Sequence, residues 1–231
     1  MEAIILAGGL GTRLRSVVSD VPKCMAPVAG KPFLFYILNY LENSNFSHVI
    51  LSLGFRHELV EEWILKNNWS FKISFSVEEE PLGTGGAIKL ALKYAQENQV
   101  LVMNGDTFFD INMDDFYQFH INKKSEISLA LKPLDHFERY GNVLIGLNDK
   151  IIAFREKEPC ESGQINGGIY LVNKDSELIK TDKVKFSFET EVLQKMASKA
   201  DLFAFVSTGY FIDIGIPEDY SKANIDFSKY K

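Results

Sequence analysis

Short apolar runs of the strand type alternate with helix-like segments through the first half of this chain. Ala3–Ala7 is a continuous apolar run, typical of a strand buried on both faces, and Phe33–Leu41 is long and apolar at helical spacing. The predicted strands and helices, in strict alternation, are Ala3–Ala7, Phe33–Leu41, Val49–Leu53, Glu58–Lys66, Ile73–Val77, Thr84–Ala95 and Val100–Met103. This order predicts an α/β fold with a parallel sheet and right-handed crossovers.

The second half is less regular and consists mainly of predicted strands. They are Ile127–Leu131, Val143–Ile145, Ile151–Phe154, Ile169–Val172, Leu202–Val206 and Tyr210–Ile212. Gly141-Asn142 and Asn148-Asp149 have turn composition, Phe188–Ala197 has a helical pattern, and Pro217 is expected in the first turn of a last helix. No Pro/Ser-rich linker divides the 231 residues. We therefore expect a single domain, 1–231, in which about 1–110 form an α/β half of the type found in nucleotide-binding proteins and about 111–231 complete the sheet and add side strands.

The charge balance limits the partners of the chain. Lys and Arg total 25 against 31 Asp and Glu, for a formal net charge of −6. This argues against a nucleic-acid partner, but a few local cations can still bind a small polyanion. No run approaches the roughly 18 apolar residues of a membrane span, and no positively charged leader opens the chain, so we expect a cytoplasmic protein without a membrane partner. Two cysteines, Cys24 and Cys160, in predicted loops, favour a reducing compartment.

A glycine-rich loop, Gly8-Gly9-Leu10-Gly11-Thr12-Arg13-Leu14, directly follows the first predicted strand. Glycines let backbone N–H groups approach a ligand closely, which suits phosphate. The loop lacks the Gly-Lys-Ser/Thr end of a Walker motif and the third glycine of a dinucleotide motif. Arg13 and Lys23 are the cations expected to bind phosphate oxygens. The alternative is a tight turn with two solvated cations.

Two aspartates follow apolar strands. Asp106 comes after Val100–Met103, and Asp213 after Tyr210–Ile212. The carboxyl ends of strands border the ligand crevice in open α/β sheets, and Mg²⁺ prefers one or two carboxylates together with phosphate oxygens and water. The alternative role for each aspartate is to cap the following helix or turn.

The segment GGLGTRLRSVVSDVPKCMAPVAGKP, residues 8–32, resembles the N-terminal signature of the sugar-1-phosphate nucleotidylyltransferases, also called NDP-sugar pyrophosphorylases. It departs from the usual pattern at Arg15-Ser16-Val17 and Cys24 and keeps the positions expected to bind phosphate. The resemblance implies a Rossmann-like, mixed, mainly parallel sheet flanked by helices, of the nucleotide-diphospho-sugar transferase type. The sequence contains no hexapeptide repeat of the kind that would predict a C-terminal β-helix. The resemblance also implies that Asp106 and Asp213 hold a catalytic Mg²⁺.

Three acidic residues, Glu78-Glu79-Glu80, lead into Pro81–Ala87. Such acidic runs are usually solvated, but the block resembles the family segment E-P-L-G-T-G/A-G-A, which implies contact between Glu80 and the nucleobase. A carboxylate can accept from both N1–H and the 2-amino group of guanine, whereas uracil offers one such donor, so GTP is favoured as the NTP. The nucleotide-binding residues implied by the resemblance are Leu6, Ala7, Gly8, Gly9, Gly11, Thr12, Arg13, Lys23, Glu80, Pro81, Gly83, Thr84, Gly85, Gly105 and Asp106.

Later blocks resemble the sugar-binding segments of the family. Phe154–Lys157 is similar to F-x-E-K, Asn166–Tyr170 to N-A/G-G-I-Y, and Phe188–Glu191 to a block that supplies a hydroxyl acceptor. The implied sugar-binding residues are Asn104, Gly141, Glu156, Lys157, Asn166, Gly167, Glu189 and Asp213. The alternatives are an exposed turn pair at Glu156-Lys157 and a plain turn at Asn166-Gly167.

The family resemblance implies that an oxygen of a sugar 1-phosphate attacks the α-phosphorus of an NTP and that pyrophosphate leaves. The expected catalytic residues are Arg13, Lys23, Asp106 and Lys157, and no motif indicates a covalent nucleophile. The likeness is greatest to members that use GTP and a heptose 1-phosphate for surface glycans. Mannose 1-phosphate with GTP, and N-acetylmuramate or glucose 1-phosphate with UTP, remain open. A non-catalytic sugar-nucleotide sensor or regulatory subunit is the alternative from another class, and a homo-oligomer is compatible with the sequence.

Overall fold

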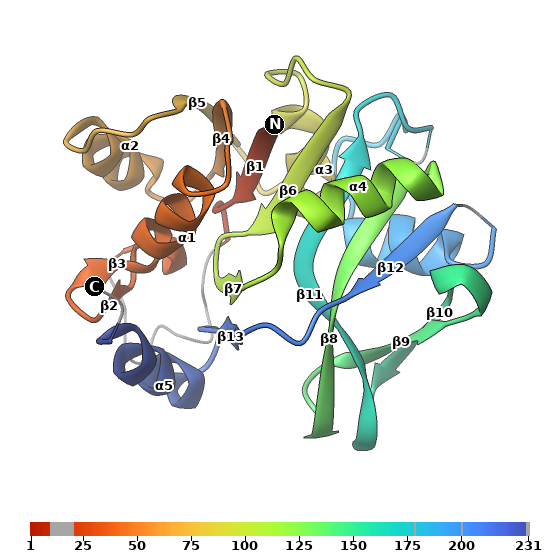
Figure 1. Cartoon of the computed structure of the whole chain (residues 1–231). Helices are drawn as coiled ribbons and strands as arrows, with labels where there is room; N and C mark the ends of the chain where they lie inside the picture. The colour runs from red at the N-terminus through yellow and green to blue at the C-terminus, as the bar shows by residue number, and fades with distance from the viewer. Residues whose placement is uncertain (10–20, 178, 200, 230–231) are drawn as a thin grey trace.

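The computed structural model describes residues 1–9, 21–177, 179–199 and 201–229. Within these ranges nine strands form one sheet: seven lie in the order β10, β9, β11, β6, β1, β4, β5, while β8 pairs with β11 and β12 pairs with β8 (Figure 1). The strands are β1 (Glu2–Leu6), β4 (His48–Leu53), β5 (Lys72–Val77), β6 (Gln99–Asn104), β8 (Ile127–Phe137), β9 (Gly141–Ile145), β10 (Ile151–Lys157), β11 (Cys160–Asn173) and β12 (Leu202–Val206). The expected α/β fold with a mixed sheet and flanking helices is confirmed.

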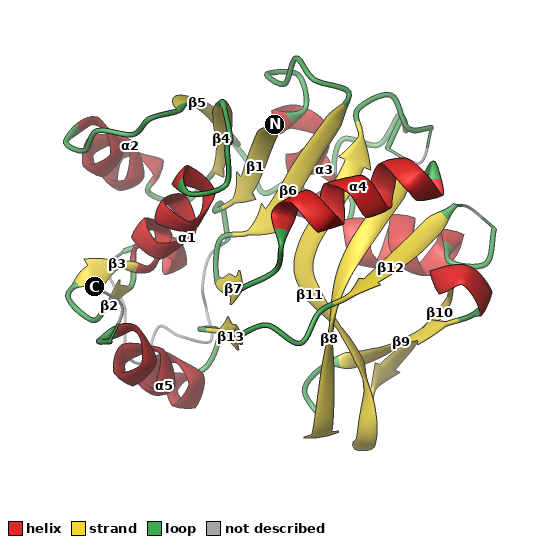
Figure 2. Ribbon diagram, viewed as in Figure 1, coloured by secondary structure: helices red, strands yellow, loops and turns green. Residues whose placement is uncertain are grey.

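Helices cover both faces of the parallel part of the sheet (Figure 2). The helices are α1 (Phe33–Glu42), α2 (His57–Leu65), α3 (Gly83–Ala91), α4 (Met113–Lys123) and α5 (Pro217–Phe227). Successive residues of β1 belong to opposite cores: Ile5 joins the core that includes α1 and α2, and Ile4 the core that includes α3. A strand buried on both faces in this way explains the continuous apolar run in the sequence. None of the described helices is long and apolar enough to cross a membrane.

The parallel strands end together at one edge of the sheet. β1 pairs in parallel with both β4 and β6, and Leu6 lies in register with Ser52 on one side and Asn104 on the other. β4 pairs in parallel with β5, which places Ser76 beside Ser52. The segments that leave these strands therefore meet at the same carboxyl edge.

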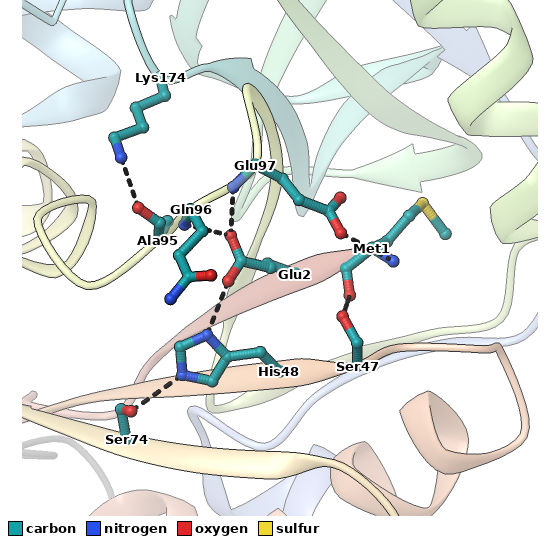
Figure 3. Close-up of polar contacts among 9 residues, drawn as sticks. All are labelled: Met1, Glu2, Ser47, His48, Ser74, Ala95, Gln96, Glu97 and Lys174. Atoms are coloured by element: carbon teal, nitrogen blue, oxygen red, sulfur yellow. Dashed lines mark hydrogen bonds and ion pairs between the residues drawn. The ribbon is translucent and has the colours of Figure 1, made fainter.

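A buried polar network lies at the opposite, amino-terminal edge of the same strands (Figure 3). One carboxylate oxygen of Glu2 accepts hydrogen bonds from the backbone N–H groups of Gln96 and Glu97, at 2.6 and 2.7 Å. The other lies 2.7 Å from Nδ1 of His48, whose Nε2 is 2.9 Å from the Ser74 hydroxyl. Glu2 is 3% exposed and His48 5% exposed, so the network joins β1, β4, β5 and the segment before β6 inside the protein.

The second half of the sheet is largely antiparallel. β11 pairs antiparallel with β6 and β8, and the β8–β11 register shifts between Asn166 and Tyr170. Gly168 in this irregularity has a φ of +73°, which favours glycine. Beyond it, the paired ends of β8 and β11 form a long ribbon that extends past the rest of the sheet (Figure 1).

Several predicted elements need correction. The predicted turn at Gly141-Asn142 is the start of β9, and Cys160 begins β11, because both segments pair with neighbouring strands. The helical pattern from Phe188 forms a π-helix, η4 (Phe188–Gln194). Cys24 lies buried in a short 3₁₀ helix, η2 (Lys23–Met25), rather than in a loop.

Some elements were not predicted. They are the 11-residue helix α4, the small strand pair β2 (Pro27–Val28) with β3 (Lys31–Pro32), and β7 (Thr107–Phe109), which pairs with β13 (Phe211–Asp213), the strand predicted at Tyr210–Ile212. The β7–β13 pair matters for the site because it places Asp213 in register with Thr107, next to Asp106.

Candidate active site

A cavity of about 470 Å³ opens at the carboxyl edge of the parallel strands. This is where open α/β sheets bind ligands. The cavity is lined by Leu6, Ala7, Gly8, Gly9, Lys23, Cys24, Ser52, Glu78, Pro81, Gly83, Thr84, Ala87, Asn104, Gly105, Asp106 and Glu189. Most described members of the predicted nucleotide-binding set, together with Asn104 and Glu189 of the predicted sugar-binding set, are thus brought to one cavity.

Two glycines let backbone segments approach each other in the cavity wall. A Cβ on Gly8 would lie 2.8 Å from Oε1 of Glu78, and one on Gly105 would lie 2.8 Å from the carbonyl oxygen of Leu6. The N–H of Gly105 donates to that same carbonyl at 2.9 Å. A side chain at Gly105 would therefore push the strand ends apart, and one at Gly8 would displace the Glu78 carboxylate.

Glu78 lines the cavity near Gly8 and Pro81, and the sequence reasoning missed it. Its Oε2 accepts a hydrogen bond of 2.8 Å from the N–H of Leu82. Burial raises the pKa of Glu78, and the Leu82 N–H offsets part of this increase. Glu80, which the family block had indicated, is exposed and does not line the cavity.

Lys23 lies between the two aspartates that were predicted to hold a metal. Its Nζ donates to Oδ2 of Asp106 and lies 3.6 Å from Oδ1 of Asp213. The lysine side chain is only 12% exposed, whereas the side chains of Asp106 and Asp213 are 35% and 28% exposed, so the ammonium group is shielded but the carboxylates remain open to solvent. Oδ1 of Asp213 also accepts from the N–H of Gly215 at 2.7 Å, which fixes the orientation of that carboxylate.

The two aspartates fit a hard divalent cation. No group of three His, Cys, Asp or Glu side chains with metal-site geometry occurs in the described part of the chain, so protein atoms alone do not form a closed cage. Two carboxylates that share one cation are the donor set that Mg²⁺ uses when phosphate oxygens and water complete its shell. Burial and the Asp106 charge raise the pKa of the neighbouring Cys24 to about 12, so the thiol stays neutral and is a poor competing ligand or nucleophile.

Tyr140 is a second residue that the sequence reasoning missed. Burial, followed by the nearby Asp213 charge, raises the pKa of its phenol to about 12. Its ring also packs edge-on against Phe211, at 6.0 Å between ring centroids. A neutral phenol thus lies near the acidic pair, in the residue just before the predicted Gly141.

Asn166 and Gly167 lie in the irregular part of β11, next to Asn104. Nδ2 of Asn166 donates to the Tyr170 hydroxyl at 2.8 Å, and its Oδ1 accepts from the N–H of Gly168 at 3.0 Å. A Cβ on Gly168 would lie 2.7 Å from Nδ2 of Asn104, so this irregularity borders the cavity wall. Burial and the charge of Glu189 raise the pKa of Tyr170, which stays neutral.

The remaining predicted residues do not line the cavity. Glu156 and Lys157 are exposed on β10, where Lys157 pairs with Gly141. Gly85 packs under the ring of Phe186. Gly11, Thr12 and Arg13 lie outside the described residues.

Comparison with known proteins gives matches over nearly the whole chain. The model of the nucleotidyl transferase family matches residues 2–229. D-glycero-α-D-manno-heptose 1-phosphate guanylyltransferase of Aneurinibacillus thermoaerophilus is 47% identical over 230 residues, which cover 100% of both chains. The protein of the same name from Campylobacter jejuni is 48% identical over 220 residues, 95% of this chain and 97% of its own. The crystal structure of HddC from Yersinia pseudotuberculosis complexed with GMP-PN has a TM-score of 0.88 and 39% identity, and the match covers 98% of this chain and 99% of that one.

Proposed function

Because this chain belongs to the nucleotidyl transferase family, we propose that it transfers a guanylyl group from GTP to D-glycero-α-D-manno-heptose 1-phosphate and releases pyrophosphate. The relatives with 47% and 48% identity carry that activity in their names, and this chain spans their full length or nearly so. The product, a GDP-heptose, is a donor for surface glycan synthesis, and the reaction is expected in the cytoplasm.

The observation that carries the proposal is the meeting of Asp106, Asp213 and Lys23 at the carboxyl edge of the sheet. The reaction joins two anionic reactants, so its barrier includes their mutual repulsion and the charge that develops on the phosphates. A site that combines two carboxylates for a cation with a shielded ammonium group supports this chemistry.

Asp106 and Asp213 are the proposed ligands of a catalytic Mg²⁺, which when bound would neutralise charge on the phosphates. Lys23 would bind an oxygen of the leaving pyrophosphate, and Arg13 and Lys157 are proposed to assist at the leaving and incoming phosphates. Gly8, Gly9 and Gly105 leave room for the nucleotide to approach the backbone. The attacking phosphate oxygen is already ionised at neutral pH, so the protein has to orient the reactants rather than generate a nucleophile.

Glu78 is the proposed reader of the guanine base. Its carboxylate is half-buried in the cavity wall and can accept from N1–H and the 2-amino group. We expect Glu78→Gln to lower kcat/KM for GTP about 10- to 100-fold, since a charge-assisted pair of hydrogen bonds is replaced by one neutral bond. ITP lacks the 2-amino group and should lose less, and an equal loss with both nucleotides would contradict this role.

Asn104 and Glu189, on β6 and η4, line the cavity and are the first proposed sugar-facing residues. Asn166 does not line the cavity but holds Gly168 next to Asn104, and it is proposed as a third residue of this group. Carboxylate and amide groups that converge on one cavity are suited to sugar hydroxyls. Glu156, Gly141 and Gly167 do not line the cavity and remain proposed sugar-binding residues.

The proposal is tested by pyrophosphate release from purified protein with Mg²⁺. GTP and UTP are each paired with the 1-phosphates of D-glycero-α-D-manno-heptose, mannose, N-acetylmuramate and glucose. We expect kcat/KM to be highest for GTP with the heptose 1-phosphate. A higher value for mannose 1-phosphate would change the assigned sugar, a higher value for UTP would refute the assigned base, and release with none of the pairs would refute the reaction.

A further inference from the structure

The first turn of α3 is joined to residues 181–189, here called the strap, which lead into and begin the π-helix η4. The N–H of Phe186 donates to the carbonyl of Leu82 at 2.9 Å, and the N–H of Gly85 donates back to the carbonyl of Phe186 at 3.0 Å. Further along α3, Nζ of Lys89 donates to the carbonyls of Thr181 and Lys183. The strap is therefore bonded to α3 at several points along its length.

The glycines at the start of α3 make this contact possible. A Cβ on Gly83 would lie 2.6 Å from the carbonyl oxygen of Phe186, and one on Gly85 would overlap the Phe186 ring. Gly83 also has a φ of +73°, which residues other than glycine adopt only at a cost in conformational energy. These glycines are thus needed for strap packing as well as for an approach of the nucleotide.

The Thr84 side chain completes the contact inside the cavity. Its hydroxyl donates to Oε2 of Glu189 at 2.5 Å and accepts from the N–H of Phe188 at 2.9 Å. The hydroxyl of Ser187 donates to the same Oε2 at 3.0 Å. Among the described residues, both side-chain hydrogen bonds to this carboxylate fall on Oε2, so Glu189 is held by one oxygen and can offer Oε1 to a ligand.

We propose that Thr84 is a positioning residue for the sugar 1-phosphate: its hydroxyl holds Glu189 so that Oε1 accepts a hydrogen bond from a sugar hydroxyl. This rests on the proposed function, in which Glu189 faces the sugar. The backbone of Thr84 belongs to the start of α3, on the proposed nucleotide side of the cavity. Its side chain, in contrast, acts on binding of the sugar 1-phosphate. The threonine thereby links the nucleotide-side helix to the sugar-side strap.

The test is the KM of each substrate in Thr84→Val, which keeps the shape of the side chain and removes the hydroxyl. Loss of one hydrogen bond that orients a charged acceptor predicts a rise of about tenfold in KM for the sugar 1-phosphate. KM for GTP should stay within about twofold of the wild-type value. Thr84→Ser, which keeps the hydroxyl, should restore KM for the sugar 1-phosphate to within about threefold. An unchanged KM for the sugar 1-phosphate, or a rise confined to GTP, would overturn the proposal.

A double-mutant cycle separates positioning from a general structural effect. If Thr84 acts through Glu189, adding Thr84→Val to Glu189→Gln should raise KM for the sugar 1-phosphate by less than about twofold beyond the single Glu189 change. Full additivity would mean that Thr84 acts independently of Glu189 and would refute the inference. If melting curves show that Thr84→Val does not fold, Thr84→Ala replaces it in the same cycle. Wild-type protein that released no pyrophosphate would refute the proposed function, whereas an active wild type with an additive cycle would refute this inference alone.

Discussion

The buried Glu2 network at the amino-terminal edge of the sheet makes a strong prediction about stability. Glu2 accepts from two backbone N–H groups and from His48, all at 2.6–2.7 Å. Glu2→Gln replaces three hydrogen bonds to a charged acceptor with neutral ones, and its amide also presents a donor to groups that are themselves donors. A hydrogen bond to a charged group contributes about 1.5–3 kcal/mol and a neutral one about 0.5–1.5, so the expected loss is about 3 kcal/mol in the free energy of unfolding.

Calorimetry at pH 7 should show this loss as a lower Tm. For a chain of this size 1 kcal/mol shifts Tm by about 2–4 °C, so the expected decrease is about 6–12 °C. Glu97→Gln is the matched control, because the Glu97 side chain is 45% exposed and, among the described residues, its one ion pair is with the amino terminus of Met1 at 3.5 Å. We expect the control to change Tm by about 2 °C at most. Turnover at 25 °C should be unchanged in both variants, since the network lies at the edge of the sheet opposite the cavity.

The pH dependence provides an independent check. Burial raises the pKa of Glu2, but the hydrogen bonds from Glu97, His48 and Gln96 outweigh it and hold the pKa below its ordinary value of 4.5. A carboxylate with a lowered folded-state pKa contributes stability above about pH 4.5, and this contribution is lost as the pH falls through the folded-state pKa. The Tm difference between wild type and Glu2→Gln should therefore be largest near pH 7 and shrink below pH 4. A Glu2→Gln protein that melted no lower than Glu97→Gln, or a difference that grew on acidification, would refute the reasoning.

Two further changes test the site. Lys23→Met should lower kcat by about 100-fold or more, because it removes the cation that faces Asp106 and Asp213. Pyrophosphate release measures the loss, and near-normal turnover would exclude a phosphate role. Gly85→Ala should destabilise the protein by about 1–3 kcal/mol, because the added methyl group displaces Phe186 and with it the strap. It should also raise KM for the sugar 1-phosphate more than KM for GTP. Melting curves and substrate titrations measure the two effects, and an unchanged Tm would contradict the packing argument.

The sequence predicted the parallel half of the fold well for a physical reason. Strands buried on both faces must be apolar throughout, so Ala3–Ala7 and Val100–Met103 are visible without knowledge of their partners. The outer parts of β8 and β11 are polar, in segments such as Lys132–Phe137, and are strands because they pair with each other. That partnership depends on the tertiary fold and has no local signal.

Another missed feature did have a local signal. Asn112 caps α4 by accepting from the N–H groups of Asp114 and Asp115, a helix-start pattern that the sequence contains. Glu78 directly follows β5, and its N–H donates to the carbonyl of Leu53 on β4 at 2.8 Å. A side-chain period of two would place Glu80 on the same face, so the sequence pattern alone does not single out Glu78. The position of Tyr140 near Asp213 depends on where separate strands meet, which the sequence alone does not specify.

The position of Lys23 between Asp106 and Asp213 has a consequence for the stability of the protein without a metal ion. Two like charges forced together would normally oppose folding until an ion arrived, but here the chain supplies its own counter-charge. The native state therefore does not need a bound divalent ion to offset the repulsion of these two carboxylates. A chelator of divalent ions should abolish pyrophosphate release and leave the Tm unchanged.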